Sequence, residues 1–197
     1  MNVPALRISN IVYGRSTREG GRVVYLLNAD GSASSYEIAE QIVLNRWKKR
    51  DLENHFFGGV RMSPNAWRAI GIRFSDYITN IEKLSEEDIN SITEADRKTP
   101  ETYKAPNAKA LKIVFSALGS DKVSQICKRH LSPERVDRYG TPDLFLWGIN
   151  AKTQKIAFIR LVEVKKPKER ISKDQVEEIE FLKSLNIPAR VLRLIER

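Results

Sequence analysis

Two acidic residues and a lysine near the C-terminal end of the chain have the types and spacing of a metal-dependent hydrolytic site. Asp143 follows a proline and opens the apolar run 144–147, whereas Glu163 and Lys165 lie in the apolar run 161–165. Carboxylate oxygens are ligands that Mg²⁺ and Mn²⁺ prefer, and such an ion polarises a phosphoryl oxygen and lowers the pKa of a bound water. The chemistry indicated is hydrolysis of a phosphodiester bond with water as the nucleophile.

Strand geometry separates charge from core in the second run. Side chains alternate faces along a strand, so Glu163 and Lys165 point one way while Val162 and Val164 point into a core. The backbone carbonyl of Val164 can complete the inner shell of the ion, and Lys165 can orient the water or offset charge in the transition state. The alternative is a solvated charge pair on an ordinary strand. The strand-initial Pro-Asp step at Asp143 favours the site.

The two apolar runs are expected to form a hairpin. Gly148 and Asn150 supply turn residues, and the next strand begins at Ile156. Pairing of the two strands brings Asp143 beside Glu163.

These residues resemble the VRR-NUC branch of the PD-(D/E)XK nuclease superfamily. A basic loop at 166–171 and a helix-opening Ser-x-x-Gln at 172–175 follow the lysine, and 181–193 resembles the closing helix, turn and last strand. The approach to the site, 118–143, is similar to that of the Fanconi-associated nuclease. The resemblance covers about the last 80 residues. It implies an α/β fold with a restriction-endonuclease-like core, in which a mixed sheet is flanked by helices and carries a helical insertion.

The resemblance also implies a site and its cofactor. It implies that Asp143, Glu163 and the carbonyl of Val164 hold Mg²⁺ or Mn²⁺, that Lys165 serves the attacking water, and that Gln175 lies near the metal or the phosphate. A second interpretation of Gln175 comes from its position three residues after Ser172, where a capping box accounts for it completely. Both can hold if the helix N-terminus faces the phosphate.

One departure from the family pattern concerns a further glutamate after the first helix. The corresponding stretch 56–60 reads Phe-Phe-Gly-Gly-Val and has no carboxylate. Glu40 or Glu53 can substitute, but the sequence favours a solvated charge near the helix end for both. Without a substitute, the metal is held weakly or the substrate completes the site.

The composition of the chain limits the classes of protein to which it can belong. The chain has 197 residues, of which 41% are hydrophobic, so a sizeable core is expected. No apolar run has the length of a bilayer span and no signal peptide is evident, which predicts a cytoplasmic protein. The single cysteine, Cys127, has the helical spacing of a buried packing residue rather than a nucleophile. His55 and His130 lack ligand-spaced partners and are interpreted as ordinary polar residues.

The net charge of +9 indicates a polyanionic partner, although a basic surface also serves solubility. Basic residues bracket the candidate site on both sides, which favours DNA. The expected phosphate contacts are Arg135, Arg138, Lys166, Lys168 and Arg170.

Periodicity divides the chain into four expected segments. These are an N-terminal β-hairpin extension over 1–33, the first helix and strand of the nuclease core over 34–60, a helical insertion over 61–131, and the catalytic core over 132–197. The hairpin strands are expected at 5–13 and 22–28.

Capping signals predict where the helices of these segments begin. A capping box at 34–37 should start the first helix, and Ser63-Pro64 should start a helix with Ile78 and Ile81 on its apolar side. A second capping box is expected at 85–88, and further helices at about 107–118 and 120–131.

The helical insertion bears on assembly and role. By resemblance, minimal relatives without it are dimers that act on four-way junctions, whereas relatives with it act as monomers on flaps. We therefore expect a monomeric, structure-selective nuclease, used in DNA repair or as an interbacterial DNase toxin with an immunity protein. The alternative is a catalytically weak DNA-binding module that retains the fold.

Overall fold

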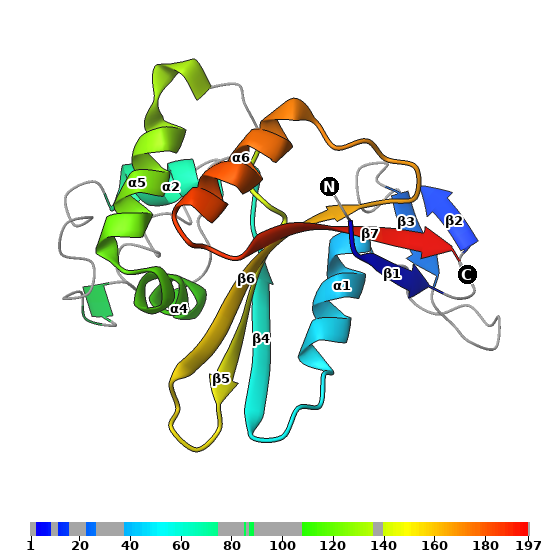
Figure 1. Cartoon of the computed structure of the whole chain (residues 1–197), viewed down its shortest axis with the longest axis horizontal. Coiled ribbons are helices and arrows are strands. Elements are labelled where there is room, and N and C mark those ends of the chain that lie inside the picture. The colour runs from blue at the N-terminus through cyan, green and yellow to red at the C-terminus, as the bar shows by residue number, and fades with distance from the viewer. Residues whose placement is uncertain are drawn as a thin grey trace.

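A computed structural model of the chain describes residues 3–8, 12–15, 23–26, 38–74, 85, 87–88, 108–135 and 140–196. Its centre is a five-stranded sheet of order β1-β7-β6-β5-β4 (Figure 1). These strands are β1 (Ala5–Ile8), β4 (His55–Arg61), β5 (Leu144–Asn150), β6 (Ile156–Lys165) and β7 (Ala189–Glu196). Strands β4, β5 and β6 pair antiparallel, whereas β6, β7 and β1 pair in parallel. The mixed sheet confirms the expected α/β fold class.

One face of the sheet is covered by α1 (Ala39–Lys48). Ile42, Val43 and Trp47 on this helix are buried against the sheet, and Val162 and Val164 belong to the same cluster. The helix begins after Ile38, an extended residue that makes no side-chain cap. The capping box expected at 34–37 lies outside the described residues.

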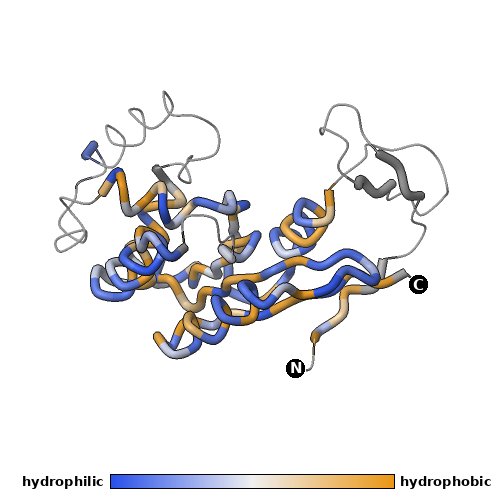
Figure 2. The backbone as a smooth tube through the Cα atoms, turned by 90° about the horizontal axis from the view of Figure 1, so that it is seen from above, coloured by the Kyte–Doolittle hydropathy of each residue, from blue (hydrophilic) through white to orange (hydrophobic). Residues whose placement is uncertain are grey.

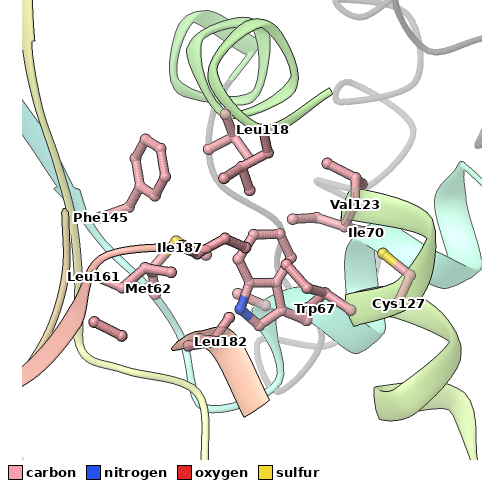
Figure 3. Close-up of a cluster of buried hydrophobic side chains, with 14 of the residues drawn as sticks. Met62, Trp67, Ile70, Leu118, Val123, Cys127, Phe145, Leu161, Leu182 and Ile187 are labelled. Atoms are coloured by element: carbon pink, nitrogen blue, oxygen red, sulfur yellow. The ribbon is translucent and has the colours of Figure 1, made fainter. Parts of the chain in front are cut away.

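The opposite face is covered by helices α2 (Ala66–Arg73), α4 (Ala108–Leu118), α5 (Ser120–Leu131) and α6 (Lys173–Ser184), grouped away from α1 (Figure 1). Their shared core surrounds Trp67, which is fully buried and lies among Leu118, Leu182 and Ile187 (Figure 3). Apolar and hydrophilic stretches alternate along these helices, as amphipathic packing requires (Figure 2). No helix in the described parts of the chain is long and apolar enough to cross a membrane.

The N-terminal strands differ from the prediction. Ala5–Ile8 is not an arm of an N-terminal hairpin, because it pairs in parallel with β7, with Leu6 opposite Leu194. The hairpin consists instead of β2 (Val12–Arg15) and β3 (Val23–Leu26). Leu6 packs against the core on the α1 face. Strand periodicity shows which residues alternate but does not identify the partner strand, so the sequence could not separate these two roles.

The helices between β4 and β5 follow their predictions closely. Helices α4 and α5 have the expected bounds, and the box at Ser85 forms through two reciprocal bonds with Asp88. Helix α2 begins at Ala66, and the expected stripe residues Ile78 and Ile81 lie outside the described residues. The division into four segments stays a prediction.

Candidate active site

The β5–β6 hairpin brings Asp143 and Glu163 together, as predicted. Leu144 pairs with Val162, so Asp143, one residue before β5, lies opposite Glu163. The N–H of Met62 donates to the Asp143 carbonyl at 2.7 Å and continues the pairing of β4 with this segment. Gly148 lies within β5 rather than in the turn, and residues 151–155 connect the strands.

Glu163 and Lys165 share one face of β6 and are buried, with 4% and 3% of their surfaces exposed. The Nζ atom of Lys165 lies 3.1 Å from Oε1 of Glu163 and 3.4 Å from Oε1 of Glu169. A solvated charge pair on an ordinary strand is therefore the wrong interpretation. Burying an ion pair costs desolvation, and a strand has no structural need to place one here.

Burial and charge repulsion make the carboxyl pair hard to ionise. Burial, followed by the charge of Glu163, raises the pKa of the Asp143 carboxyl to about 8, although the Val164 N–H opposes this by donating to Oδ2 at 2.7 Å. Burial also raises the pKa of Glu163, despite the opposing charge of Lys165. A cation between two such carboxylates would offset both effects.

The donor set fits a hard divalent cation. The N–H and C=O of one strand residue leave the strand on the same side, so the Val164 carbonyl is directed toward the side on which Asp143 lies. Two carboxylates, one carbonyl and water are oxygen ligands of the kind that Mg²⁺ and Mn²⁺ take. In the described ranges, no three acidic, histidine or cysteine side chains stand close enough to form a metal site by themselves.

Glu40 stands nearer this site than the sequence indicates. It lies in the first turn of α1, is partly buried, and its charge acts to raise the pKa of both Asp143 and Glu163. Glu40 lies at the end of the helix, as expected, and is partly buried there. Glu53 is exposed and precedes His55, at the end of β4 far from Arg61, which pairs with Leu144. Of the two candidates Glu40 is thus the nearer to the site, and its role as a substitute ligand stays a prediction.

Gln175 forms the expected capping box and also contacts Glu163. Ser172 caps α6 by accepting from the Gln175 N–H at 3.2 Å, while the Gln175 Oε1 atom accepts from the Ser172 N–H at 3.0 Å. Because the amide oxygen faces the cap, the amide nitrogen is directed the other way. It donates to Oε1 of Glu163 at 2.5 Å. The capping box therefore fixes the orientation of the amide that contacts the site.

The loop between β6 and α6 carries basic residues beside the site. Lys168 and Arg170 are exposed, and Lys166 is partly buried. Arg193 of β7 holds this loop by donating to the carbonyls of Lys166 at 3.1 Å and Glu169 at 2.7 Å.

The remaining expected phosphate contacts cannot be placed. Residue Arg135 ends a short 3₁₀ helix and its side chain is not described, and Arg138 lies outside the described residues. Phosphate binding by any of the five basic residues stays a prediction.

A buried charged cluster escaped the sequence analysis. Glu178 of α6 is fully buried, with Oε1 lying 2.7 Å from Nε2 of His130 and Oε2 lying 3.1 Å from Nε of Arg129. His130 is therefore not an ordinary polar residue. One feature of the sequence could have indicated this cluster. Glu178 lies beside Ile179 and one turn from Leu182, on the buried side of the helix.

Cys127, on the preceding turn of α5, is a packing residue as predicted. It is fully buried. Burial raises the pKa of its thiol to about 12, so the thiolate form is disfavoured.

A mixed sheet whose central hairpin carries a buried Asp, Glu and Lys is the arrangement of the PD-(D/E)XK nucleases. The chain belongs to the VRR-NUC domain family, which matches residues 80–194, more than half of its length.

Two solved structures share the fold. The crystal structure of paFAN1 bound to DNA with a 2-nucleotide 5′ flap and a gap is 14% identical, has a TM-score of 0.56, and aligns with 82% of this chain and 35% of its own. The paFAN1 structure with a 1-nucleotide 5′ flap is 12% identical, has a TM-score of 0.58, and aligns with 100% of this chain and 38% of its own. This chain therefore spans little more than a third of those proteins. No curated protein matches it.

Proposed function

We propose that the chain is a divalent-metal-dependent DNA nuclease that hydrolyses phosphodiester bonds, with flap or splayed DNA as its substrate. The observation that carries the proposal is the buried pair of Asp143 and Glu163 with Lys165 beside it. Membership of the VRR-NUC family supports nuclease activity, and the paFAN1 structures, which contain flap DNA, support the choice of substrate.

Each residue of the proposed site has a separate role. Asp143, Glu163 and the Val164 carbonyl hold Mg²⁺ or Mn²⁺, with Glu40 as a further carboxylate. The bound ion supplies an activated water and polarises the phosphoryl oxygen. Lys165, held between Glu163 and Glu169, provides positive charge for the transition state or orients the water. Gln175 fixes the carboxylate of Glu163 through its amide.

We propose that the protein acts on DNA, either in the cytoplasm or inside a target cell. The role is DNA repair, or alternatively an interbacterial toxin that an immunity protein neutralises. The immediate neighbourhood of the gene separates these roles, because a toxin gene lies beside its immunity gene.

A catalytically weak DNA-binding module is the second candidate, and one observation favours it. Gly58 and Gly59 occupy the stretch where the family carries a further glutamate, and a side chain at either position would collide with Trp147 or with Leu146 and Leu44. A third carboxylate would therefore have to come from a different element, such as Glu40 of α1, and no three acidic side chains stand together in the described ranges.

The discriminating experiment is cleavage of labelled 5′-flap, splayed and duplex DNA with Mg²⁺ or Mn²⁺. Glu163→Gln and Lys165→Ala should each reduce the cleavage rate by about 100-fold or more, because Glu163 holds the metal and Lys165 supplies charge to the transition state. Glu180→Gln is the matched control, since Glu180 is exposed on α6 and pairs with Lys183. If the wild-type protein binds these DNAs and cuts none with either metal, the binding module is the correct function.

A further inference from the structure

Three arginines from three elements meet on the α1 face of the sheet. Arg50 follows α1, Arg160 lies on β6 and Arg190 on β7. Arg190 is opposite Val162, and Arg160 lies two residues before Val162, so both arginines share the face on which Val162 packs against α1. The cluster is thus on the sheet face opposite Glu163 and Lys165.

Aromatic rings hold two of these guanidinium groups in place. The Cζ atom of Arg50 lies 5.0 Å from the ring centroid of Trp47 and 5.6 Å from that of Phe57. The Cζ atom of Arg160 lies 6.0 Å from the same Trp47 ring. A ring attracts the positive charge but satisfies none of the N–H donors of a guanidinium, so their hydrogen-bonding capacity remains for another group.

The cluster contains no compensating acid among the residues that the structure describes. The Nε atom of Arg190 is buried without a hydrogen-bond partner there. Burial, followed by the charges of Arg160 and Arg50, lowers the pKa of Arg190, and burial followed by Arg50 lowers that of Arg160. Like charges are therefore close enough to repel one another.

Three other partly buried arginines behave differently. Arg129 pairs with Glu178, Arg193 donates to two loop carbonyls, and Arg68 donates to the His130 carbonyl at 3.1 Å. Each of these has an acceptor within the protein. The cluster of Arg50, Arg160 and Arg190 differs: two of its guanidinium groups lie near the Trp47 ring, and the Nε atom of the third, Arg190, has no acceptor among the described residues.

We infer that Arg50, Arg160 and Arg190 bind a backbone phosphate of the DNA strand, away from the phosphate that is cut. Guanidinium groups match phosphate oxygens through paired N–H bonds, which favours a phosphate over a diffuse counterion. The inference rests on the proposed function, since the bound strand is the one that enters the site.

The geometry places this phosphate a few nucleotides from the cut. Glu40, near the candidate site, begins the same helix whose C-terminal end is followed by Arg50. A helix of ten residues is about 15 Å long, and phosphates of one strand are spaced by about 3.4 Å along the duplex axis. The length of α1 thus corresponds to a few phosphate spacings, so one DNA strand that follows this helix can reach both sites.

The test measures binding separately from cutting. Fluorescence anisotropy with a fluorescein-labelled 5′-flap DNA should give a Kd about tenfold higher for Arg160→Gln/Arg190→Gln, and the slope of log Kd against log salt should fall by about one to two. The same pair of substitutions in a Glu163→Gln background should give the same change.

Lys152→Gln/Lys155→Gln is the matched control, since it removes two charges from the exposed β5–β6 turn. The inference is overturned if the double arginine variant has the same Kd as this control. It is also overturned if thermal unfolding shows that a loss of folded protein accounts for the whole rise in Kd. Repulsion among the arginines predicts an unchanged or higher Tm for the pair. If the wild-type protein binds DNA through these arginines but never cuts it, the proposed function is contradicted and this inference stands.

Discussion

The carboxyl groups of Asp143 and Glu163 lie in a largely buried position, where burial raises the pKa of both and the charge of Glu163 raises that of Asp143 further. With a folded pKa of about 8, Asp143 is mostly protonated at neutral pH in the absence of a cation. Metal binding therefore requires loss of that proton, and metal affinity should rise with pH up to about 8. The raised pKa values mean that the two carboxyl groups do not by themselves stabilise the fold, which is consistent with the proposed metal site.

This arrangement leads to a prediction for Asp143→Asn. The amide keeps the shape of the side chain and can still accept from the Val164 N–H, but it lacks the charge that a hard cation needs. Isothermal titration calorimetry should show loss of Mn²⁺ binding. The Tm of the metal-free protein should stay the same or rise at pH 8 and above, because the repulsion with Glu163 is removed.

Asp121→Asn is a suitable comparison, because Asp121 is exposed on α5, far along the chain from the hairpin. Unchanged Mn²⁺ affinity in Asp143→Asn would remove Asp143 from the ligand set. A large fall in Tm would show that the carboxylate has a structural role instead.

Among the elements, α6 links the site to the helical layer. Gln175 contacts Glu163, and one turn later Glu178 is bound by His130 and Arg129 of α5. Burial acts to raise the pKa of Glu178, but the hydrogen bond and charge of His130, followed by those of Arg129, outweigh it, so the pKa lies below its ordinary value. The buried cluster holds α6, and with it the amide of Gln175, against α5.

The lowered pKa of Glu178 gives a pH-dependent stability. Because the folded pKa is below the unfolded value of about 4.5, the stabilisation is present above pH 4.5 and is lost as the pH falls through the folded pKa. Glu178→Gln should cost on the order of 2 kcal/mol at pH 7, the scale of hydrogen bonds to a charged group. The difference in Tm between wild type and variant should shrink as the pH falls below 4.5.

Thermal unfolding of Glu177→Gln provides the comparison, since Glu177 is the preceding residue of α6 and pairs with Lys173 near the surface. Equal pH dependence in the Glu178→Gln variant and the wild type would show that Glu178 is not the titrating group.

The sequence predicted the elements that depend on local pattern. The hairpin of Asp143 and Glu163 follows from alternation and turn residues within a short stretch, and the capping box of Ser172 and Gln175 follows from a spacing of three. The pairing of β1 with β7 joins the two ends of the chain, and His130 meets Glu178 from 48 residues away. Such contacts depend on how elements pack, which no periodicity records. The position of Glu40 near the site also depends on how α1 packs on the sheet, so the sequence pattern could not predict it.

For the whole molecule, a net charge of +9 predicts DNA binding that weakens steeply with salt. The exposed side chains of Lys168 and Arg170 leave the active-site strand directly and precede the N-terminus of α6, where a phosphate is already favoured. Lys168→Glu/Arg170→Glu should weaken binding to all DNA sequences alike, as measured by anisotropy on unrelated duplexes, because phosphate contacts carry no base information. A variant that changes affinity for one sequence only would assign these residues to base recognition.

The helices between β4 and β5 bear on assembly. Helices α2, α4 and α5 pack together over the sheet face that carries Glu163 and Lys165, and their core includes Phe145, Trp147 and Leu161 of the central hairpin. The family resemblance implies that minimal relatives use these strands for dimer contacts, and this layer of helices covers them. We therefore predict a monomer that prefers flaps or splayed ends to intact four-way junctions. Multi-angle light scattering should give a mass near 22.6 kDa at all concentrations, and cleavage should introduce one nick per flap. A stable dimer that cuts a four-way junction symmetrically would place the chain with the junction-resolving relatives instead.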